Sequence, residues 1–446
     1  MDAHPYGAVL TSAAAPSLFT RARLHARARL HYRREHLLAG LVLLGLLPRL
    51  ALIFARHADF EFWEYETLAQ NIASGSGYSI SRFGHTVLAF GDGNLYSFLA
   101  GVLYAMFGHQ PLVLGVVQAV LVSLAAPVVF AIAERSFGTR TAALGAALTA
   151  LHPGLMAYTL KLHPLGLDVL LLMLLIFWGL RQPWNSGNAL VTGLTLGLNL
   201  MSRPTFFVAG LAGLAATWCT RHVGVRRILL VTALGVLVAM PWIGRNWLLL
   251  GRPTLTSTSF EDVWKGNNLA ATGSGMLGPG SDIFDAAPID LRNRIWQSNE
   301  LQVGDVFAQE TLRFIEQQPD RFAGLVARKF VYFWWLPQQA GVLYPSIWLR
   351  AYEVYAVVVY ALAVIGAAAI LRGGRSDQRD FLATVVSIGL TLAVIHALAY
   401  VEGRHRWGLE PLILVLTAQG VFSLAGSLRG LTWEAQSRVF RRVSER

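Results

Sequence analysis

The sequence contains little charge and a single cysteine. Of its 446 residues, only 14% are charged, whereas 54% are hydrophobic and the mean hydropathy is +0.47. Soluble domains carry about 25% charged residues, so this composition excludes an ordinary soluble protein and predicts one that crosses a membrane repeatedly. Because Cys219 has no second cysteine to pair with, a framework of intramolecular disulfides is excluded as well.

Sequence motifs of several enzyme and transporter classes are also absent. No glycine-rich loop precedes a Lys-Ser or Lys-Thr pair, so the chain lacks the phosphate loop of ATP-dependent enzymes. Its histidines and carboxylates are not grouped at the spacing of metal ligands, so no metal site is predicted. A Gly-x-Ser-x-Gly nucleophile elbow and an internal repeat of the transporter kind are missing too. The sequence therefore contains no motif of an ATP-dependent enzyme, a metal-dependent enzyme, a nucleophile-elbow hydrolase or a repeat-based transporter.

Long apolar stretches follow one another through the chain and predict an all-α, polytopic membrane protein. A helix that crosses a bilayer perpendicularly needs about 20 apolar residues, so the shorter stretches are expected to extend into their flanking turns. We predict about ten transmembrane helices, with juxtamembrane helices and one long outer loop. The predicted spans are Leu37–Ala55, Leu112–Ala133, Thr141–Leu151, Leu165–Leu180, Ala189–Met201, Thr205–Cys219, Arg227–Trp247, Ile347–Leu371, Phe381–Val401 and Trp407–Leu424, and Asn94–Phe107 is predicted to lie along the membrane surface or to re-enter it.

Basic residues set the predicted orientation in the membrane. A run of arginines lies between Arg21 and Arg34, and no acidic residue interrupts it. Such a run can bind nucleic acid, but directly before an apolar helix it marks the cytoplasmic side, so no nucleic-acid partner is predicted. Later segments on the same side are also basic, which places both termini in the cytoplasm of a multi-pass protein of the cell inner membrane. The predicted segments are a basic cytoplasmic segment 1–36, a transmembrane module 37–250 with a first outer loop 56–94, an outer region 251–346, C-terminal transmembrane helices 347–428 and a basic cytoplasmic tail 429–446.

The first outer loop brings acidic and aromatic residues together. Asp59, Glu61 and Glu64 are interleaved with large aromatic side chains. If residues 58–73 form one helix, Glu61, Glu64 and Tyr65 share a face, whereas Asp59 and Glu61 point in nearly opposite directions. Carboxylates that are partly removed from water beside aromatic rings can act as general bases. The alternative is an amphipathic surface helix with a solvated acidic side.

Isolated cations on the predicted outer side are candidates for binding an anion. A guanidinium binds phosphate through paired N–H donors, and ionisable groups at membrane depth are functional candidates by default. Interfacial anchoring by snorkelling side chains explains Lys161 and Arg245 equally well. The candidates are Lys161, Arg203, Arg245, Arg404 and Arg406.

The outer region also contains a pair of amide side chains. Asn267 and Asn268 follow Gly266, and this combination favours a turn. Amide groups offer both donors and acceptors to sugar hydroxyls. An ordinary Asn-rich turn is the alternative.

Six short segments, spread over most of the chain after residue 50, are more informative together than singly. They are EYETLAQNIASGSGYS (64–79), GLTLGLNLMSRP (193–204), PWIGRNWLLLGRP (241–253), KGNNLAATGS (265–274), ETLRFIEQQPDRFAGLVARKFVYFWW (310–335) and RHRWGLEP (404–411). Their order resembles that of the bacterial integral membrane glycosyltransferases of the C-type fold. These enzymes are relatives of the protein O-mannosyltransferases and of the aminoarabinose transferase that acts on lipid A.

The resemblance implies a glycosyltransferase that moves a hexose or pentose from a polyprenyl-phosphate donor to an acceptor hydroxyl. The transfer would take place on the outer face of the cytoplasmic membrane, and a single displacement would invert the anomeric centre. The implied partners are the lipid-linked donor, membrane lipids and an acceptor that is a lipid, a glycan or a protein. No cofactor is implied, and the need for a divalent metal is left open.

The resemblance also implies roles for individual residues. In relatives, an aspartate four residues before the loop tyrosine, here Tyr65, acts as the base. Glu61 stands at that position and is favoured, with Asp59 and then Glu64 as the other acidic candidates. His163-Pro164 and Gly93-Asn94 depart from the pattern of the relatives, which leaves the acceptor open. The implied donor-phosphate ligands are Arg203, Arg245, Arg404, Arg406 and Lys161, and the implied acceptor or sugar ligands are Tyr65, Asn246, Asn267 and Asn268.

Three other classes of membrane protein share some of these features. A flippase for lipid-linked sugars would use the same arginines but would need no base, so Glu61 and Asp59 would be dispensable. An O-antigen polymerase or ligase also binds lipid phosphate through outer arginines, but the ordered segments match it less well. A purely structural membrane protein would show no sharp loss when any single outer charge is replaced.

Overall fold

The computed structural model describes residues 18–181, 185–335 and 344–444 and is built mostly of helices, which confirms the predicted all-α class. Parts of the predicted segments 1–36 and 429–446 lie outside these residues. The long helices are α1 (Leu18–Arg56), α4 (Pro111–Ser123), α5 (Ala125–Ala150), α7 (Leu165–Gly179), α8 (Ser186–Ser202), α9 (Pro204–Thr220), α10 (Val225–Leu250), α15 (Ser346–Gly373), α16 (Ser376–Leu398) and α18 (Glu410–Ser444).

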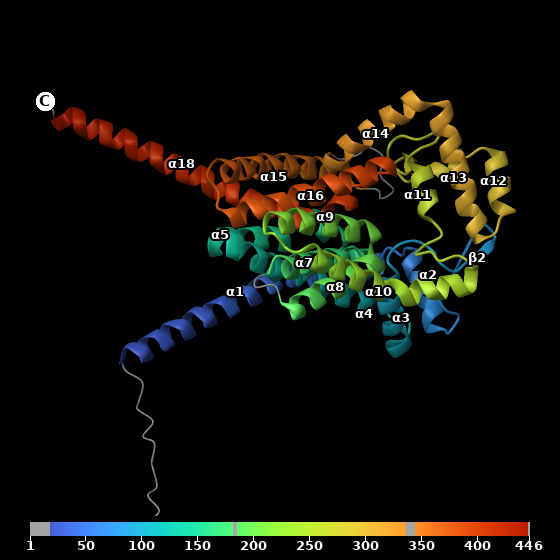
Figure 1. Ribbon diagram of the computed structural model, residues 1–446, viewed down its shortest axis with the longest axis horizontal. Coiled ribbons are helices and arrows are strands. Elements are labelled where there is room, and N and C mark those ends of the chain that lie inside the picture. Colours follow the sequence, from blue (N-terminus) through green and yellow to red (C-terminus); the bar gives the residue numbers. More distant parts are fainter. Residues whose placement is uncertain (1–17, 182–184, 336–343, 445–446) are drawn as a thin grey trace, which may run out of the picture.

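Smaller elements lie mainly at one end of these helices (Figure 1). Two short antiparallel hairpins, β1 (Ile80–Arg82) with β2 (His85–Val87) and β3 (Met276–Gly278) with β4 (Ser281–Asp282), belong to this group. The shorter helices are α2 (Glu64–Ala73), α3 (Asn94–Phe107), α6 (Pro153–Ala157), α11 (Ser259–Lys265), α12 (Ile289–Trp296), α13 (Glu300–Gln317), α14 (Pro319–Trp334) and α17 (Arg404–Trp407).

Six helical stretches among the described residues are long and apolar enough to cross a membrane. Three shorter apolar helices, α3, α7 and α9, accompany them. Large apolar side chains such as Leu237 and Val364 are exposed, as expected where lipid covers the protein surface. The structure is therefore that of a multi-pass membrane protein, and the number of about ten spans stays a prediction. The six stretches are Arg34–Asp59, Pro111–Leu160, Val225–Leu250, Ser346–Gly373, Ser376–Leu398 and Glu410–Ser427.

The stretch from Pro111 to Leu160 is broken at a glycine. Gly138 has φ 77° and ψ 170°, a non-helical conformation within α5 that glycine adopts without steric cost. The break falls where the sequence predicts a turn between the spans Leu112–Ala133 and Thr141–Leu151. The two predicted spans are thus separate helical runs.

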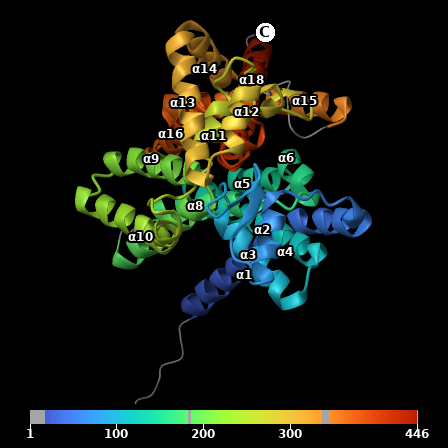
Figure 2. The ribbon, with the colours of Figure 1, turned by 90° about the vertical axis from the view of Figure 1, so that its right-hand side faces the viewer.

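Figure 1 shows the long helices side by side, with α1 and α18 projecting from one end of the molecule and α11–α14 gathered at the other. We call residues 254–334, which contain α11–α14, the outer module. Seen from that end in Figure 2, α9 and α10 lie on one side of the molecule and α2, α3 and α4 on the other.

The turns that were predicted to be cytoplasmic come together at the end opposite the outer module. Arg34 of α1 pairs with Glu134 of α5 at 3.0 Å, and Arg375 Nη2 donates to the backbone oxygen of Ser136 at 2.6 Å. Basic segments that are distant in sequence therefore share one end of the molecule. This grouping agrees with the predicted grouping of loops on one side of the membrane.

The predicted single helix over residues 58–73 is wrong. Residues 57–59 form a 3₁₀ turn, and α2 begins only at Glu64. Between them the chain is extended, because the backbone of Glu61 pairs with the 152–164 loop: its N–H donates to Leu160 O at 2.9 Å, and its carbonyl accepts from Leu162 N at 3.1 Å. Glu61 therefore does not share a helix face with Glu64 and Tyr65.

Candidate active site

A cavity of about 820 Å³ lies where the outer module meets the ends of the long helices. Its wall is built from the first outer loop, the turn between α8 and α9, α11 and the loop after α16. Of the predicted site residues, Glu64, Tyr65, Arg203 and Arg404 line this cavity. The charged lining residues are Glu64, Arg82, Asp92, Arg203, Glu261, Asp262, Lys265, Asp282, Glu402 and Arg404.

Arg203 reaches the cavity from the turn between α8 and α9. Pro204 starts α9, and the backbone of Arg203 is extended between the two helices, because proline suits the first helical position and disfavours helix before it. The Arg203 side chain is 8% exposed, and its Nε lies 3.0 Å from Asp168 Oδ2. Ser202 Oγ donates to the other oxygen of Asp168 at 2.5 Å. Since Asp168 contacts the guanidinium at Nε, the terminal N–H groups stay available for an anion.

Arg404 brings a second guanidinium to the same cavity. It begins α17, a single turn that follows the loop after α16. Its side chain is 10% exposed and forms an ion pair with Glu402. The guanidinium also stacks on Trp63, with 5.0 Å between Cζ and the ring centroid. Two largely buried arginines at one cavity are an arrangement that suits a phosphate.

Glu261 of α11 neutralises two other cations of the cavity wall. It forms an ion pair with Arg82 of β1 and lies 3.0 Å from Lys265 Nζ. These two cations hold the pKa of Glu261 below its usual value although burial opposes them. Arg82 and Lys265 thus share one carboxylate, whereas Arg203 and Arg404 each have a carboxylate of their own, Asp168 and Glu402.

Two further carboxylates, Asp92 and Asp262, lie in the cavity wall. Burial raises the pKa of Asp92, and the charge of Arg203 opposes this rise. Burial likewise raises the pKa of Asp262 to about 7, against the charge of Lys265. Within the described parts of the chain, no group of three or more His, Cys, Asp or Glu side chains is arranged to hold a metal ion.

Tyr65 packs into the inner wall of the cavity. It is 7% exposed, and its ring lies edge-on to His163 at 5.4 Å and to Tyr96 at 5.9 Å between centroids. Gly93 has φ 82°, and a Cβ on it would lie 2.8 Å from the Tyr65 ring. A residue with a side chain could not occupy this position without moving the ring. This contact gives a physical reason for the Gly93-Asn94 departure.

Glu61, Asp59 and Lys161 lie outside the cavity. Lys161 and Glu61 form an ion pair, and Trp63 Nε1 donates to Glu61 Oε1 at 3.0 Å. Glu61 lines a neighbouring surface pocket of about 590 Å³, which Trp63 and Glu64 also line. Asp59 is exposed and pairs with Arg56. Of the three predicted acidic candidates, Glu64 is the one in the cavity wall.

Arg245 holds the loop that contains β1 and β2, and its neighbour Asn246 holds the segment that follows α10. Arg245 Nη1 donates to Leu88 O and Nη2 to Tyr78 O, at 2.8 and 3.1 Å. Asn246 Nδ2 donates to Thr254 O at 2.8 Å. The paired donors that were predicted to bind a phosphate thus bind backbone carbonyls.

The two predicted sugar-binding asparagines, Asn267 and Asn268, are buried and engaged by the protein itself. Asn267 Nδ2 donates to Leu398 O at 2.7 Å, and its oxygen accepts from Lys329 Nζ at 2.7 Å. Asn268 Nδ2 donates to Trp264 O at 2.8 Å. The bond from Asn267 to Leu398 attaches the outer module to the end of α16, and neither asparagine lines the cavity.

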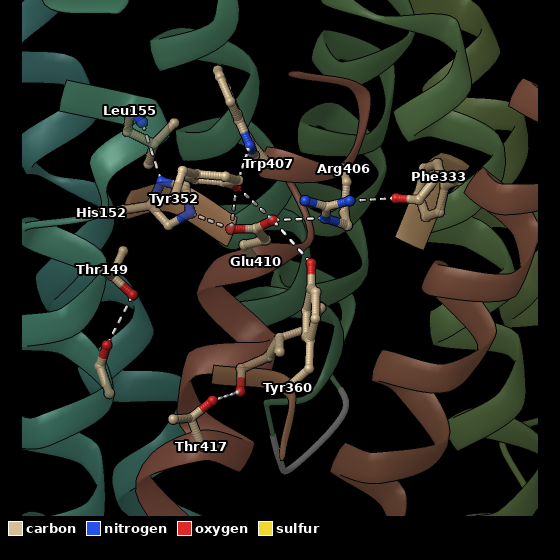
Figure 3. Close-up of polar contacts among 12 residues, drawn as sticks. Thr149, His152, Leu155, Phe333, Tyr352, Tyr360, Arg406, Trp407, Glu410 and Thr417 are labelled. Atoms are coloured by element: carbon tan, nitrogen blue, oxygen red, sulfur yellow. Dashed lines mark hydrogen bonds and ion pairs between the residues drawn. The ribbon is translucent and has the colours of Figure 1, made fainter. Parts of the chain in front are cut away.

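Arg406 belongs to a buried polar network around Glu410 (Figure 3). Its Nε lies 2.7 Å from Glu410 Oε1, and its Nη1 donates to Phe333 O at 2.5 Å. His152 pairs with the other oxygen of Glu410, and the hydroxyls of Tyr352 and Tyr360 donate to Glu410 as well. The network joins α6, α14, α15 and α18 to α17. Arg406 therefore holds in place the short helix that carries Arg404.

A second cavity, of about 570 Å³, adjoins the first at Glu402 and Arg404, which line both. Its other lining residues are apolar or aromatic side chains from α6, α15 and α17 and from the segments beside them, Pro153, Tyr158, Ile347, Trp348, Tyr352 and Trp407 among them. The site thus combines a charged cavity and an apolar one, and Arg404 lies where they meet.

The sequence analysis did not identify Asp92, Asp262, Arg82 or Lys265 as site residues. Asp92 lies between two glycines, and Asp262 is surrounded in sequence by Glu261 and Lys265. The cluster of charged residues in this loop can be seen in the sequence. The local pattern does not show which of these side chains face a common cavity.

The architecture is that of a multi-pass membrane protein with a charged cavity where residues 254–334 meet the ends of the long helices. A family model described as dolichyl-phosphate-mannose-protein mannosyltransferase matches residues 93–244. No curated protein sequence matches the chain.

The fold is shared, at low sequence identity, with archaeal oligosaccharyltransferases of known structure. The archaeal oligosaccharyltransferase AglB from Archaeoglobus fulgidus, in complex with an inhibitory peptide and a dolichol-phosphate, superposes with a TM-score of 0.50 and 12% identity, over 91% of this chain and 52% of that one. The apo form of an oligosaccharyltransferase from the same organism gives a TM-score of 0.50 and 14% identity, over 92% and 52%. For ArnT from Cupriavidus metallidurans, bound to undecaprenyl phosphate, the values are 0.39 and 16%, over 80% and 72%.

The chain spans about half the length of the archaeal oligosaccharyltransferases that it matches. Together, the match to residues 93–244 and the shared fold confirm the resemblance drawn from the six segments. The chain has the C-type fold of integral membrane glycosyltransferases.

Proposed function

We infer that the protein transfers a sugar from a polyprenyl-phosphate donor to an acceptor hydroxyl. The observation that carries this inference is the junction of a charged cavity and an apolar cavity at Arg404. A lipid-linked sugar has the same two halves, a hydrocarbon chain and a phosphate that bears the sugar. The dolichol-phosphate in the archaeal oligosaccharyltransferase of the same fold supports a donor of this class.

The donor would lie across the junction. Its prenyl chain would occupy the apolar cavity beside Trp348 and Trp407, and its phosphate would lie between Arg404 and Arg203. The sugar would then extend into the charged cavity towards α11. The partly neutralised Arg82 and Lys265 would face the sugar or the acceptor.

The reaction is a single displacement. The acceptor oxygen forms a bond to the anomeric carbon, the bond from this carbon to the phosphate oxygen breaks, and the phosphate leaves with the electron pair. A carboxylate takes the acceptor proton. Arg203 and Arg404 stabilise the charge that develops on the phosphate, which lowers the barrier in a site shielded from water. Attack from the face opposite the phosphate inverts the anomeric centre.

The membrane orientation follows from the distribution of basic residues. Arg34 and Arg375 lie at the end opposite the cavity, and positively charged loops favour the cytoplasmic side. We therefore place the cavity on the outer face of the cell inner membrane, with both termini in the cytoplasm. The acceptor would be a lipid, a glycan or a protein reached from that face.

Binding of a prenyl phosphate tests the donor site. In lipid nanodiscs, Arg404→Ala should weaken the affinity of purified protein for a synthetic prenyl phosphate at least tenfold, because it removes a buried cation at the junction. Arg372→Ala is the matched control, since Arg372 is an exposed arginine near the opposite end of α15. Equal affinities for all three proteins would reject this donor site. A protein that binds the lipid-linked sugar and moves it across vesicles without any transfer would be a flippase.

A further inference from the structure

We propose that His163 and His405 bind the phosphate of the lipid-linked donor, each through a neutral Nε2–H group. This inference rests on the proposed function and adds two ligands to its donor site. His163 stands at a position where this chain departs from the pattern of its relatives. Both histidines are buried, and they line the charged cavity together with Arg203 and Arg404.

The backbone determines which ring nitrogen of His163 carries the proton. His163 Nδ1 accepts a hydrogen bond from Leu165 N–H at 3.1 Å, where α7 begins. A ring nitrogen that accepts a hydrogen bond carries no proton, so the ring is neutral and its proton is on Nε2. The imidazole of His163 is therefore a hydrogen-bond donor at Nε2 and has no free acceptor.

The Nε2 edge of His163 faces the charged cavity. Leu165, which binds the Nδ1 edge, lines a separate small void on one side of the ring, and the charged cavity borders the ring as well. The rings of Trp63, Tyr65 and Tyr158 lie edge-on to His163, with 5.0, 5.4 and 5.1 Å between centroids, and hold it in place. Among the described residues, His163 Nε2 has no hydrogen-bond partner.

His405 is held in the same way. Its Nδ1 accepts from Glu402 N–H at 3.2 Å, which again puts the ring proton on Nε2. The ring stacks on His396 with 4.0 Å between centroids and lies edge-on to Tyr400 at 5.1 Å. In the part of the chain that the structure describes, no group accepts a hydrogen bond from His405 Nε2. Two donors without a partner are thus held at the wall of one cavity.

A third histidine shows what such a donor binds. His152 Nδ1 accepts from Leu155 N–H at 3.1 Å, and its Nε2 pairs with the Glu410 carboxylate (Figure 3). There an anionic oxygen of the protein satisfies the Nε2–H group. His163 and His405 repeat this arrangement, but no carboxylate of the described residues pairs with their Nε2 atoms. An anion bound in the cavity would take that place.

The two histidines lie beside the proposed phosphate site. Arg404 stacks on the ring of Trp63, and the same ring lies edge-on to His163. His405 directly follows Arg404 in α17. Arg203 pairs with a carboxylate in the first turn of α7, the helix that begins two residues after His163. Both arginines therefore reach the cavity next to a histidine.

The hydrogen-bonding capacity of these four groups matches a phosphate. A guanidinium, and an imidazole whose Nδ1 is occupied, can only donate hydrogen bonds. The oxygens of an ionised phosphate only accept them, whereas a sugar hydroxyl both donates and accepts. Hydrogen bonds to a charged oxygen are also stronger than neutral ones. The histidines would therefore stabilise the phosphate as it leaves with the electron pair.

The surroundings keep both histidines neutral. Burial lowers the pKa of His163, and the charges of Arg404 and Arg203 lower it further. Burial lowers the pKa of His405 as well, and His396 and the same two arginines act in the same direction. This effect agrees with the proton positions that the backbone hydrogen bonds require. Both Nε2–H donors are thus present at neutral pH.

Two replacements of His163 in the full-length protein separate the roles of its ring nitrogens. In His163→Asn, the amide oxygen can accept from Leu165 N–H as Nδ1 does, but nothing replaces Nε2–H. Its affinity for a synthetic prenyl phosphate in nanodiscs should fall about 10- to 100-fold, as expected for the loss of a hydrogen bond to a charged group. Its affinity for the prenyl alcohol of the same length should not change.

In His163→Gln, the amide can reach the place of Nε2 but leaves Leu165 N–H without its acceptor. This variant should keep more of the prenyl-phosphate affinity than His163→Asn and should melt at a lower temperature. The reverse order, in which His163→Gln loses the phosphate and His163→Asn keeps it, would mean that His163 only caps α7.

A second histidine and a control complete the experiment. His405→Asn should weaken prenyl-phosphate binding to a similar extent, again with no effect on the alcohol. His222→Asn is the matched control, because His222 is exposed in the turn between α9 and α10. This control should bind both lipids like the wild type.

Three results would overturn the proposal. They are an affinity for prenyl phosphate within twofold of wild type in either Asn variant, an equal loss of affinity for the alcohol, and a loss confined to a prenyl phosphate that carries a sugar. If His163→Asn failed to fold, His163→Gln and His405→Asn would decide in the same way. Failure of the wild type to bind any prenyl phosphate would instead reject the proposed function.

Discussion

At the scale of single residues, the role of a charged side chain depends on a partner that is distant in the chain. Glu61 and Lys161 are 100 residues apart in sequence and form an ion pair. Arg203 and Asp168 lie on different helices and pair at 3.0 Å. Each pair includes a residue that was predicted to bind the donor phosphate. Of Lys161 and Arg203, only Arg203 lines the charged cavity.

Replacement of Glu61 tests the base that the resemblance implies. Because Glu61 is paired with Lys161 outside the cavity, Glu61→Gln should keep at least about a third of the wild-type turnover and the full affinity for prenyl phosphate. Ion pairs with an exposed partner contribute about 0–1 kcal/mol to stability, so the protein should remain folded. A 10²-fold or larger loss of turnover in Glu61→Gln, with prenyl-phosphate affinity kept, would instead identify Glu61 as the base.

At the scale of elements, α17 is too short to hold its own position. Four residues form one turn, and an isolated turn is unstable in water because helix nucleation is unfavourable. Its place is set by the network around Glu410, which joins it to α6, α14, α15 and α18 (Figure 3). The position of Arg404 therefore depends on a carboxylate that does not line the charged cavity.

Removal of the Glu410 charge should disturb both stability and donor binding. Glu410→Gln leaves Arg406 buried without its counter-charge, and breaking a buried pair from one side costs about 3–5 kcal/mol. We expect a lower melting temperature in detergent and a weaker affinity for prenyl phosphate, because α17 loses its anchor. The control is Glu316→Gln, an exposed acid on α13. If both variants melted like the wild type, the network would not anchor α17.

At the same scale, α15 and α18 approach each other closely at two glycines. A Cβ on Gly366 of α15 would lie 2.1 Å from Leu416 O of α18, and one on Gly420 would lie 2.0 Å from Leu362 O. Small residues allow such contacts between helices in a membrane. These glycines bring together α15 and α18, which contribute Tyr352, Tyr360 and Glu410 to the network.

At the scale of the whole molecule, the charged cavity and the basic turns lie at opposite ends. This arrangement predicts the result of a topology experiment. A reporter fused after Ser281, beside the cavity, should report the outer compartment, and one fused after Ser376, at the start of α16, should report the cytoplasm. The reverse result at both sites would place the cavity in the cytoplasm, where the proposed transfer could not take place as described.

The sequence by itself determined the class of this protein, most of its helices and the grouping of its loops. Apolar length and the positions of arginines are local properties, so they can be recognised without knowledge of the packing. The break at Gly138 and the outer turn at Arg203 were predicted for the same reason. The six ordered segments were sufficient to recognise the C-type fold.

Only the tertiary structure decided which side chains meet in the site. The extended backbone at Glu61 depends on the 152–164 loop, and the burial of Asn267 depends on the end of α16. Glu261 and Arg82 form an ion pair although they are 179 residues apart in the sequence. Charges act through pairs whose members lie far apart in the chain, and their strength depends on burial. Neither the pairing nor the burial is a property of the local sequence.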